Sequence, residues 1–199
     1  IRVLAWEGTV VGTVNDAPLP VTGRGERSLS VAVHSTQGAL ALGTNWERLY
    51  KVSAKGERVW VKYLGSDVVG VNLIESRDLL VAATANGLLW LFRWSDGAPV
   101  MRYYLQPLSR RWLAISTPGY YEASTGAEDL AGWIVNPTQP RVADFMPMSR
   151  FRSTLLLTGL GRQAWTSQDE SQAVKALLTA RGQLAERSEE HTSELQSQR

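Results

Sequence analysis

The side chains that most often perform acid, base or nucleophilic chemistry are scarce in this sequence. It contains no cysteine and two histidines, His34 and His191. The lack of cysteine excludes a disulfide framework, thiolate metal sites and a cysteine nucleophile. His34 ends an alternating, strand-like run, where a structural or exposed histidine is expected rather than a catalytic one, and no Gly-x-Ser-x-Gly pattern occurs. We therefore assign no catalytic, cofactor-binding or metal-binding residue.

Three weaker patterns could also carry chemistry. The acidic residues Glu122, Glu128 and Asp129 could form an acid/base pair, but no histidine or second cluster accompanies them in the sequence. The segments Gly23-Arg24-Gly25 and Gly159-Leu160-Gly161-Arg162 lack the strand-turn-helix context of a phosphate loop, so we interpret both as loops. Asn136-Pro137-Thr138 has proline in the middle position, which excludes N-glycosylation.

Aromatic residues are frequent around residue 120. Tyr120, Tyr121 and Trp133 could form a cage for a cationic ligand. The eight tryptophans of the chain follow the faces of the predicted strands, however, so core packing is the favoured interpretation.

The charge distribution argues against two classes of partner. The formal net charge is +2, and the longest basic cluster, Arg110-Arg111 with Arg102 nearby, is explained by a solvated strand edge. Nucleic acid and anionic membranes are therefore not predicted partners. No window approaches the ~18 apolar residues of a membrane span, so we expect a soluble chain and, by default, a cytoplasmic one.

Both ends of the sequence look cut. The chain begins with Ile1 in a strand-like segment, which suggests that the true N-terminus is missing. Residues 187–199 resemble a translated sequencing adapter, and we exclude them from functional reasoning, although a polar disordered tail is the alternative. Without this segment, which holds two arginines and three glutamates, the net charge becomes about +3 and His34 is the only histidine.

A repeat with an offset of 40 residues organises the middle of the chain. Leu40-Ala41-Leu42-Gly43-Thr44 aligns with Leu80-Val81-Ala82-Ala83-Thr84, and Leu49-Tyr50 aligns with Leu89-Trp90. Each repeat reads as four short strands separated by turn residues such as Asn86-Gly87 and Asp96-Gly97. The predicted strands are 31–34, 39–44, 48–53 and 58–64 in the first repeat, then 68–74, 79–84, 88–94 and 98–105 in the second.

The period and the four strands are typical of β-propeller blades. We predict an all-β fold: a partial propeller of two to three four-stranded antiparallel blades with a short C-terminal helical extension. A third blade is expected to open at Arg111, and no helix is expected between Val68 and Leu105. Because a blade cannot bury both of its faces alone, we expect further blades upstream.

The block from Arg111 to Ser124, with Asp129-Leu130-Ala131-Gly132-Trp133 and Ala143-Asp144-Phe145-Met146-Pro147-Met148-Ser149-Arg150-Phe151-Arg152, resembles bacterial WD-repeat proteins. In many of these the propeller is followed by a caspase-like cysteine peptidase domain. The resemblance covers about residues 28–181. It departs from the family pattern at Thr117-Pro118-Gly119, where a glutamate usually precedes the glycine, and at Ile134, where histidine is usual. The peptidase residues would lie downstream, so the resemblance implies no catalytic residue in this chain.

After Arg152 the pattern changes to a helical period. Ser167-Gln168-Asp169-Glu170 reads as a capping box for a helix over about 168–181, with Gly182 as a stop. This helix is expected to pack on the last blade or to begin a linker. The predicted organisation is 1–27, end of a preceding blade and loop; 28–67 and 68–108, blades; 109–152, closing blade and extension; 153–186, helical linker; 187–199, adapter-like segment.

The function predicted from these features is that of a non-catalytic scaffold. It would bind a protein partner, or a downstream effector domain of the same protein, and regulate or target it. The alternative is the regulatory region of a caspase-like cysteine peptidase. A propeller enzyme with a cofactor in its channel lacks any matching cluster of ligands, so we predict no cofactor.

Overall fold

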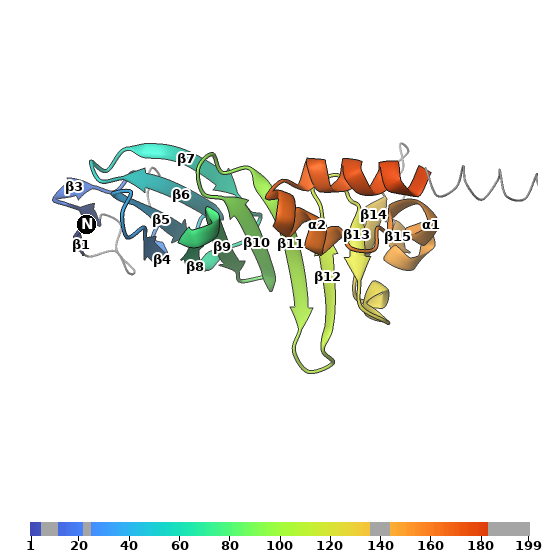
Figure 1. The fold of residues 1–199 in the computed structure, drawn as a ribbon. Coiled ribbons are helices and arrows are strands. Elements are labelled where there is room, and N and C mark those ends of the chain that lie inside the picture. Colours follow the sequence, from blue (N-terminus) through green and yellow to red (C-terminus); the bar gives the residue numbers. More distant parts are fainter. Residues whose placement is uncertain (5–11, 22–24, 136–143, 183–199) are drawn as a thin grey trace, which may run out of the picture.

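The computed structural model describes residues 1–4, 12–21, 25–135 and 144–182. The fold is a row of layers (Figure 1): a small N-terminal sheet, a four-stranded sheet, a six-stranded sheet and a group of C-terminal helices. All sheets are antiparallel. The predicted class, an all-β partial propeller with a helical extension, is confirmed.

The first blade matches the predicted strands closely. Its strands are β4 (Ser28–Val33), β5 (Ala39–Thr44), β6 (Arg48–Ser53) and β7 (Arg58–Tyr63), paired in chain order. The turn before β7 contains Gly56, whose φ of +79° favours glycine, and a Cβ there would lie 2.6 Å from a backbone oxygen. The alternation of β-branched and apolar residues with glycine turns is therefore enough to locate this sheet.

The second sheet has six strands rather than four. Its order along the sheet is β8, β9, β10, β11, β12, β13. The expected third blade at Arg111 is wrong, because β12 pairs directly with β11 and extends the second sheet. Arg110 takes φ +55° in the connecting turn, and this left-handed residue closes a tight hairpin where the sequence has no glycine. The strands are β8 (Val68–Ile74), β9 (Leu79–Thr84), β10 (Leu88–Arg93), β11 (Pro99–Gln106), β12 (Arg111–Ile115) and β13 (Tyr121–Ala123).

One short helical element interrupts the predicted strand region. Residues Glu75–Arg77 form a single 3-10 turn, η1, between β8 and β9. The expectation of no helix between Val68 and Leu105 is wrong at this turn. Asp78 closes it with φ +53°, so the predicted turn residues tighten into a helical turn before the chain reverses.

Neighbouring sheets in the row bury the faces that they turn toward one another. The N-terminal strands β1 (Val3–Leu4), β2 (Thr13–Val14) and β3 (Ala17–Pro18) pack on the first blade around Leu40, Tyr50 and Val52. Between the blades lies a second cluster that includes Leu49, Val68, Leu80, Phe92 and Trp94. Layers that are joined by side-chain contacts rather than by strand pairing resemble the nearest-neighbour stacking of repeat proteins.

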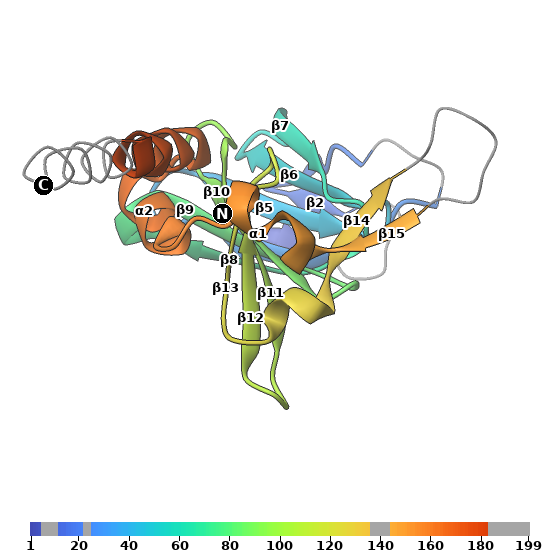
Figure 2. The ribbon, with the colours of Figure 1, turned by 90° about the vertical axis from the view of Figure 1, so that its right-hand side faces the viewer.

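Helices cover the far face of the second sheet (Figures 1 and 2). Leu160 and Ala164 of α2 (Leu160–Ser167), with Ala173 and Val174 of a helix that begins at Glu170, pack on that face. The expected packing of the C-terminal helix on the last sheet is therefore confirmed. The remaining elements are η2 (Ala127–Leu130), β14 (Gly132–Val135), β15 (Asp144–Pro147), η3 (Met148–Phe151) and α1 (Arg152–Leu155).

Two local helix predictions need correction. Asp169 rather than Ser167 caps the last helix, because its Oδ1 accepts a hydrogen bond of 3.0 Å from Gln172 N. Ser167 instead ends α2, and Gln168 follows with φ +54°. The predicted loop 159–162 begins α2, with Gly159 before its first turn. Gly182, the predicted stop, is still helical.

The ends of the stacked strands form two rims, which we name by their turns. Rim A comprises turns 45–47, 64–67, 85–87 and 107–110, and rim B comprises turns 34–38, 54–57, 75–78 and 94–98. Neighbouring turns bond to one another on each rim. Leu64 N donates to Glu47 O at 2.8 Å on rim A, and Trp94 Nε1 donates to Gln37 Oε1 at 2.7 Å on rim B.

Candidate functional site

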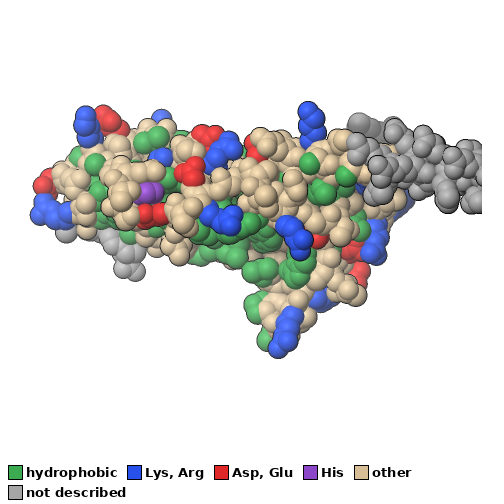
Figure 3. Space-filling view, in the orientation of Figure 1, with side chains coloured by type: hydrophobic (Ala, Val, Ile, Leu, Met, Phe, Trp, Pro, Cys, Tyr) green, Lys and Arg blue, Asp and Glu red, His purple; other side chains and the backbone are tan. Residues whose placement is uncertain are grey.

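Exposed large apolar side chains gather on rim A. Trp46 is 40% exposed and Tyr63 is 66% exposed, and Leu108 at the tip of the β11–β12 hairpin is fully exposed. Val69 and Leu105, at the rim A ends of β8 and β11, are also exposed. Figure 3 shows hydrophobic side chains on the projecting hairpin and on the adjoining lower side of the sheets. Several exposed apolar groups on one rim mark an interaction surface more often than isolated ones do.

Three of the rim A side chains form a stack, which we call the aromatic-arginine cluster: Trp46, Arg48 and Tyr63. The Arg48 guanidinium carbon lies 5.3 Å from the centre of the Trp46 ring and 5.4 Å from the centre of the Tyr63 ring. Arg48 and Tyr63 are direct cross-strand partners on β6 and β7, and Trp46 comes from the preceding turn. Cation–π contacts with both rings hold the guanidinium and the two aromatic side chains together.

A buried carboxylate supports this cluster from below. Glu26 is fully buried and accepts hydrogen bonds from Arg48 Nη1 at 2.8 Å, Tyr50 OH at 2.9 Å and Thr44 Oγ1 at 2.8 Å. The hydrogen bond with Tyr50 is the main cause that raises the pKa of Arg48 above its ordinary value. The cluster is thus a charged, preorganised surface with little side-chain freedom left to lose on binding.

Rim B is built differently, around the buried Trp94. Its indole stacks on His34 with ring centres 5.8 Å apart and meets Trp60 edge-on at 6.2 Å. Lys51 Nζ lies 4.2 Å from the Trp94 ring centre and donates to Trp94 O at 2.9 Å. Burial is the main cause that lowers the pKa of Lys51. Residues from both blades meet in this group, so it fastens one blade to the other.

His34 is part of this fastening. It is 6% exposed, and its Nδ1 accepts hydrogen bonds from Thr36 N at 3.3 Å and Gln37 N at 3.2 Å. Glu75 Oε2 lies 3.6 Å from the same nitrogen. A ring nitrogen held by two backbone amides and stacked on a tryptophan has a structural role here, as the sequence predicted.

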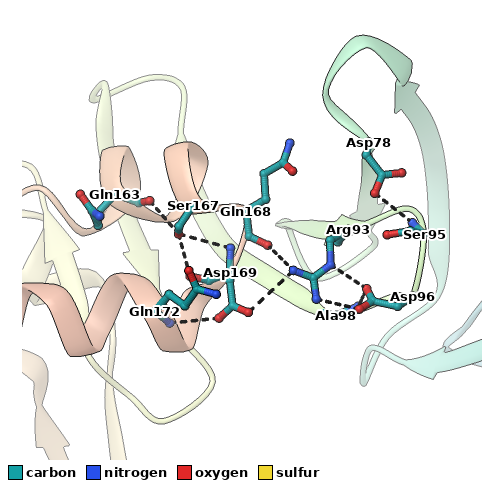
Figure 4. A network of polar contacts seen from close by, with 10 residues as sticks. All are labelled: Asp78, Arg93, Ser95, Asp96, Ala98, Gln163, Ser167, Gln168, Asp169 and Gln172. Atoms are coloured by element: carbon teal, nitrogen blue, oxygen red, sulfur yellow. Dashed lines mark hydrogen bonds and ion pairs between the residues drawn. The ribbon is translucent and has the colours of Figure 1, made fainter.

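A polar network at rim B also fixes the C-terminal helices to the second sheet (Figure 4). Arg93 binds Asp96 through two hydrogen bonds of 2.9 and 2.7 Å, and it reaches Gln168 O at 3.3 Å and Asp169 Oδ2 at 3.7 Å. The hydrogen bond from Arg93 is the main cause that lowers the pKa of Asp96 to about 2. Arg77 lies over the Trp165 ring at 5.0 Å and adds a second link to α2.

The predicted acidic residues have structural partners. Glu122 accepts hydrogen bonds from Gly159 N at 2.8 Å and Gly161 N at 2.9 Å, which occupies the first amides of α2. Glu128 accepts one from Tyr121 OH at 2.7 Å and pairs with Arg152 at 3.4 Å. Both line one hollow of about 190 Å³, and Asp129 does not. The structure brings no histidine to them among the described residues, and their hydrogen bonds and ion pair give both glutamates structural partners.

The aromatic and basic residues near residue 120 also serve the core. Tyr120 packs in the cluster under the helices, while Tyr121 and Trp133 pack in a different cluster on the other side of β12 and β13. A cage is therefore not formed, and the favoured core interpretation is confirmed. The prediction of a solvated strand edge is wrong for Arg102, because this residue is half-buried over Trp90 and donates to Ser116 O at 2.9 Å.

Several functional classes find no support in the described part of the chain. The described residues contain no group of three His, Cys, Asp or Glu side chains that could hold a metal ion. None of their helices is long and apolar enough to cross a membrane. Residues 23–24, the Asn136-Pro137-Thr138 segment and the adapter-like residues 187–199 lie outside the described residues.

Sequence reasoning missed the aromatic-arginine cluster. Trp46, Arg48 and Tyr63 lie on different elements, and no single motif contains them. The register of β6 and β7 was nevertheless available from the predicted strands 48–53 and 58–64, since the connecting turn places Arg48 opposite Tyr63. A systematic search of cross-strand pairs for exposed Arg, Trp and Tyr would have found it.

Comparisons with known proteins are consistent with this description but add no function. No protein-family model matches the sequence, and a comparison with curated proteins finds no match. Among solved structures, BamB from Moraxella catarrhalis is similar at 15% identity over 58% of this chain and 45% of that chain, with a TM-score of 0.42. A chain of the mitotic checkpoint complex is similar at 17% identity over 50% of this chain and 34% of that chain, with a TM-score of 0.39. Raptor from Chaetomium thermophilum is similar at 11% identity over 53% of this chain and 12% of that chain, with a TM-score of 0.41. The similar region is less than half of each of these chains, so the fold assignment rests on the sheets themselves.

Proposed function

We propose that this chain is a protein-interaction module that binds its partner through rim A. The observation that carries the proposal is the aromatic-arginine cluster, in which Trp46, Arg48 and Tyr63 are stacked, accessible and supported by the buried Glu26. Tryptophan, tyrosine and arginine are the residue types most enriched among binding hot spots. A cluster ordered before binding also reduces the entropy lost when a partner docks.

A protein partner suits rim A better than nucleic acid or a membrane does. The turns of rim A carry Glu47, Asp67 and Arg110, so charges of both signs are mixed on this rim. A nucleic-acid or anionic-lipid surface would instead select a patch of one sign. The mixed rim with an aromatic centre has the composition of a protein interface.

The identity of the partner defines two versions of this proposal. In the first, a separate protein binds rim A and the chain acts as a scaffold. In the second, the partner is an effector domain of the same protein, and the resemblance of residues 111–152 to WD-repeat proteins with a caspase-like peptidase domain favours that arrangement. In both versions the reaction, if there is one, belongs to the partner, since His34 and the glutamates of this chain are held in structural contacts.

Site-specific photo-crosslinking tests the proposal. A photoreactive phenylalanine analogue is placed at Tyr63 on rim A or, as a matched control, at the exposed Lys55 on rim B, and adducts formed in the source cells are identified by mass spectrometry. We expect a discrete adduct from position 63 and none from position 55. Trp46→Ala should reduce that adduct at least tenfold, because it removes one ring of the cluster.

The outcomes separate the alternatives. An adduct within the same polypeptide supports the effector-domain version, and an adduct with another protein supports the scaffold version. Fractionation of the same cells tests the cytoplasmic location that we propose with it. Equal labelling from positions 55 and 63, or an adduct indifferent to Trp46→Ala, would contradict a binding surface at rim A.

A further inference from the structure

The β11–β12 hairpin projects from the second sheet as a finger (Figure 1). Its tip carries Leu108, which is fully exposed, and Leu105, which is 47% exposed. A leucine without any cover at the end of a hairpin gains about 2 kcal/mol when it enters an apolar pocket. The tip therefore has the form of an anchor.

All charged side chains of the finger are basic. Residues 97–121 contain Arg102, Arg110 and Arg111 and no aspartate or glutamate. Arg110 is exposed at the tip, whereas the Arg111 guanidinium is held by Gln106 Oε1 and Gly126 O. The surface that the finger presents is thus apolar at Leu108 and basic at Arg110. It suits a partner surface with an apolar hollow beside acidic groups.

Such a surface exists on this same chain. The hollow lined by Glu122 and Glu128 adjoins a larger hollow of about 310 Å³ that is lined mainly by apolar groups, including Leu157, Leu177 and Ala180, with Arg181 as its charged residue. The two hollows share Leu156 and Thr158, and we call them together the groove. Arg152 offsets one of the two carboxylates, so the acidic part of the groove keeps a net negative charge.

The finger and the groove are neighbours on each molecule, and one hydrogen bond joins them. Arg111, which directly follows the turn at the tip of the finger, donates to Gly126 O at 2.8 Å, and Gly126 lines the acidic hollow. Leu108, in the turn itself, is fully exposed, so it does not occupy its own groove. Adjacent, complementary features of this kind can satisfy each other across a two-fold axis, as in isologous dimers.

We propose that two copies of this chain associate reciprocally, each placing Leu108 in the apolar part of the other's groove and Arg110 beside its acidic part. This interface goes beyond the proposed partner surface and leaves the aromatic-arginine cluster free. A small interface with one anchor and one charge contact on each side gives a weak, salt-sensitive dimer.

Sedimentation equilibrium on the full chain tests this inference. Across about 1 µM to 1 mM protein, the average mass should rise from the 22.0 kDa of one chain toward twice that value. Leu108→Ser and Arg110→Glu should each raise the dimer dissociation constant at least tenfold, and 0.5 M salt should weaken the dimer further. Tyr63→Ser at the end of β7 and Arg27→Glu just before β4 are matched controls in the first blade, away from the finger, and should leave the dissociation constant unchanged.

Disulfide trapping provides a second measurement, because the chain has no cysteine of its own. Mixed Leu108→Cys and Leu177→Cys proteins should form an intermolecular disulfide under mild oxidation, whereas Leu108→Cys mixed with Lys55→Cys should not. A monomer at every concentration, or a dimer insensitive to both finger substitutions, would overturn the inference. A dimer lost with Tyr63→Ser alone would overturn it too, by assigning self-association to the aromatic-arginine cluster.

Discussion

The two rims of the stacked sheets use similar residues for opposite purposes. Trp94 on rim B is 1% exposed and contacts His34, Lys51 and Gln37 of the other blade, whereas Trp46 on rim A is 40% exposed. Both tryptophans lie next to a cation. Lys51 is buried together with the Trp94 ring, whereas Arg48 contacts the exposed ring of Trp46. Rim B therefore holds the layers together, and rim A is exposed to a partner.

The difference follows from where the polar side chains find partners. On rim B, Glu75 binds Ser35 of the first blade, and Arg93 binds the turn between the C-terminal helices. On rim A the contacts between neighbouring turns join parts of the same sheet, through backbone bonds such as Ala85 N to Asp67 O at 2.9 Å and through Ser66 Oγ, which accepts from Asn86 N at 3.2 Å. These bonds leave the large side chains of Trp46 and Leu108 exposed. Substitutions should accordingly affect stability on rim B and binding on rim A.

The largest expected effect comes from removing the centre of rim B. Trp94→Ala should lower the free energy of unfolding by about 3–5 kcal/mol, because it leaves a cavity between the blades and removes the partner of Lys51. Urea denaturation followed by circular dichroism measures this. A loss below about 1 kcal/mol would break the distinction between the rims.

A smaller effect is expected where rim B meets the helices. Arg93→Ala removes the hydrogen bonds to Asp96 and Gln168 and should cost about 0.5–1.5 kcal/mol, because solvent screens this partly exposed pair. Hydrogen exchange should accelerate mainly in residues 160–182, which the substitution frees from the sheet. Arg58→Ala, which changes an exposed arginine at the start of β7, is the control. If Arg93→Ala leaves the hydrogen-exchange protection of the helices unchanged, apolar packing alone docks them on the sheet.

Acid should weaken rim B through Asp96. The hydrogen bond from Arg93 lowers the pKa of Asp96 to about 2, below its value of about 3.9 in an unfolded chain. Its contribution to stability is therefore present above about pH 4 and is lost as the pH falls toward 2. Asp96 is half exposed, so solvent keeps this contribution small. Asp96→Asn should flatten the fall in stability between pH 4 and 2, and an unchanged slope would contradict this assignment.

The smallest effect on stability is expected on rim A. Trp46→Ala and Tyr63→Ala truncate exposed rings and should each change the free energy of unfolding by only about 0.5–1 kcal/mol. Binding of the crosslinked partner should nevertheless fall at least tenfold. Parallel denaturation and binding measurements on the same variants check this. A larger loss of stability than for Trp94→Ala would reverse the roles of the two rims.

The strands of both blades could be predicted from sequence because turn residues delimit them. The bounds of β5, β6, β8 and β9 agree with the predicted ranges, and glycine or aspartate with positive φ marks turns next to them. The sequence could not show in this way that the predicted third blade is absent. The chain instead reverses at the β11–β12 turn, where Arg110 takes a left-handed conformation that a non-glycine residue rarely adopts and that the local sequence does not indicate.

The candidate site was less accessible to sequence reasoning than the fold. Glu26 contacts Arg48 from 22 residues away, and a buried carboxylate cannot be told from a surface one by its neighbours in the sequence. The capping box shows the same limit at shorter range. Ser167 and Asp169 are both good N-caps, and the packing of α2 on the sheet decided between them.

The arrangement in a row also determines how the molecule would respond to force. Strand hydrogen bonds lie within each layer, while side-chain clusters and the rim B contacts connect one layer to the next. Tension along the row would therefore load the contacts between layers and spare the ladders within them. The polar contacts of rim B would break last. The layers would therefore separate first at rim A and pivot about rim B.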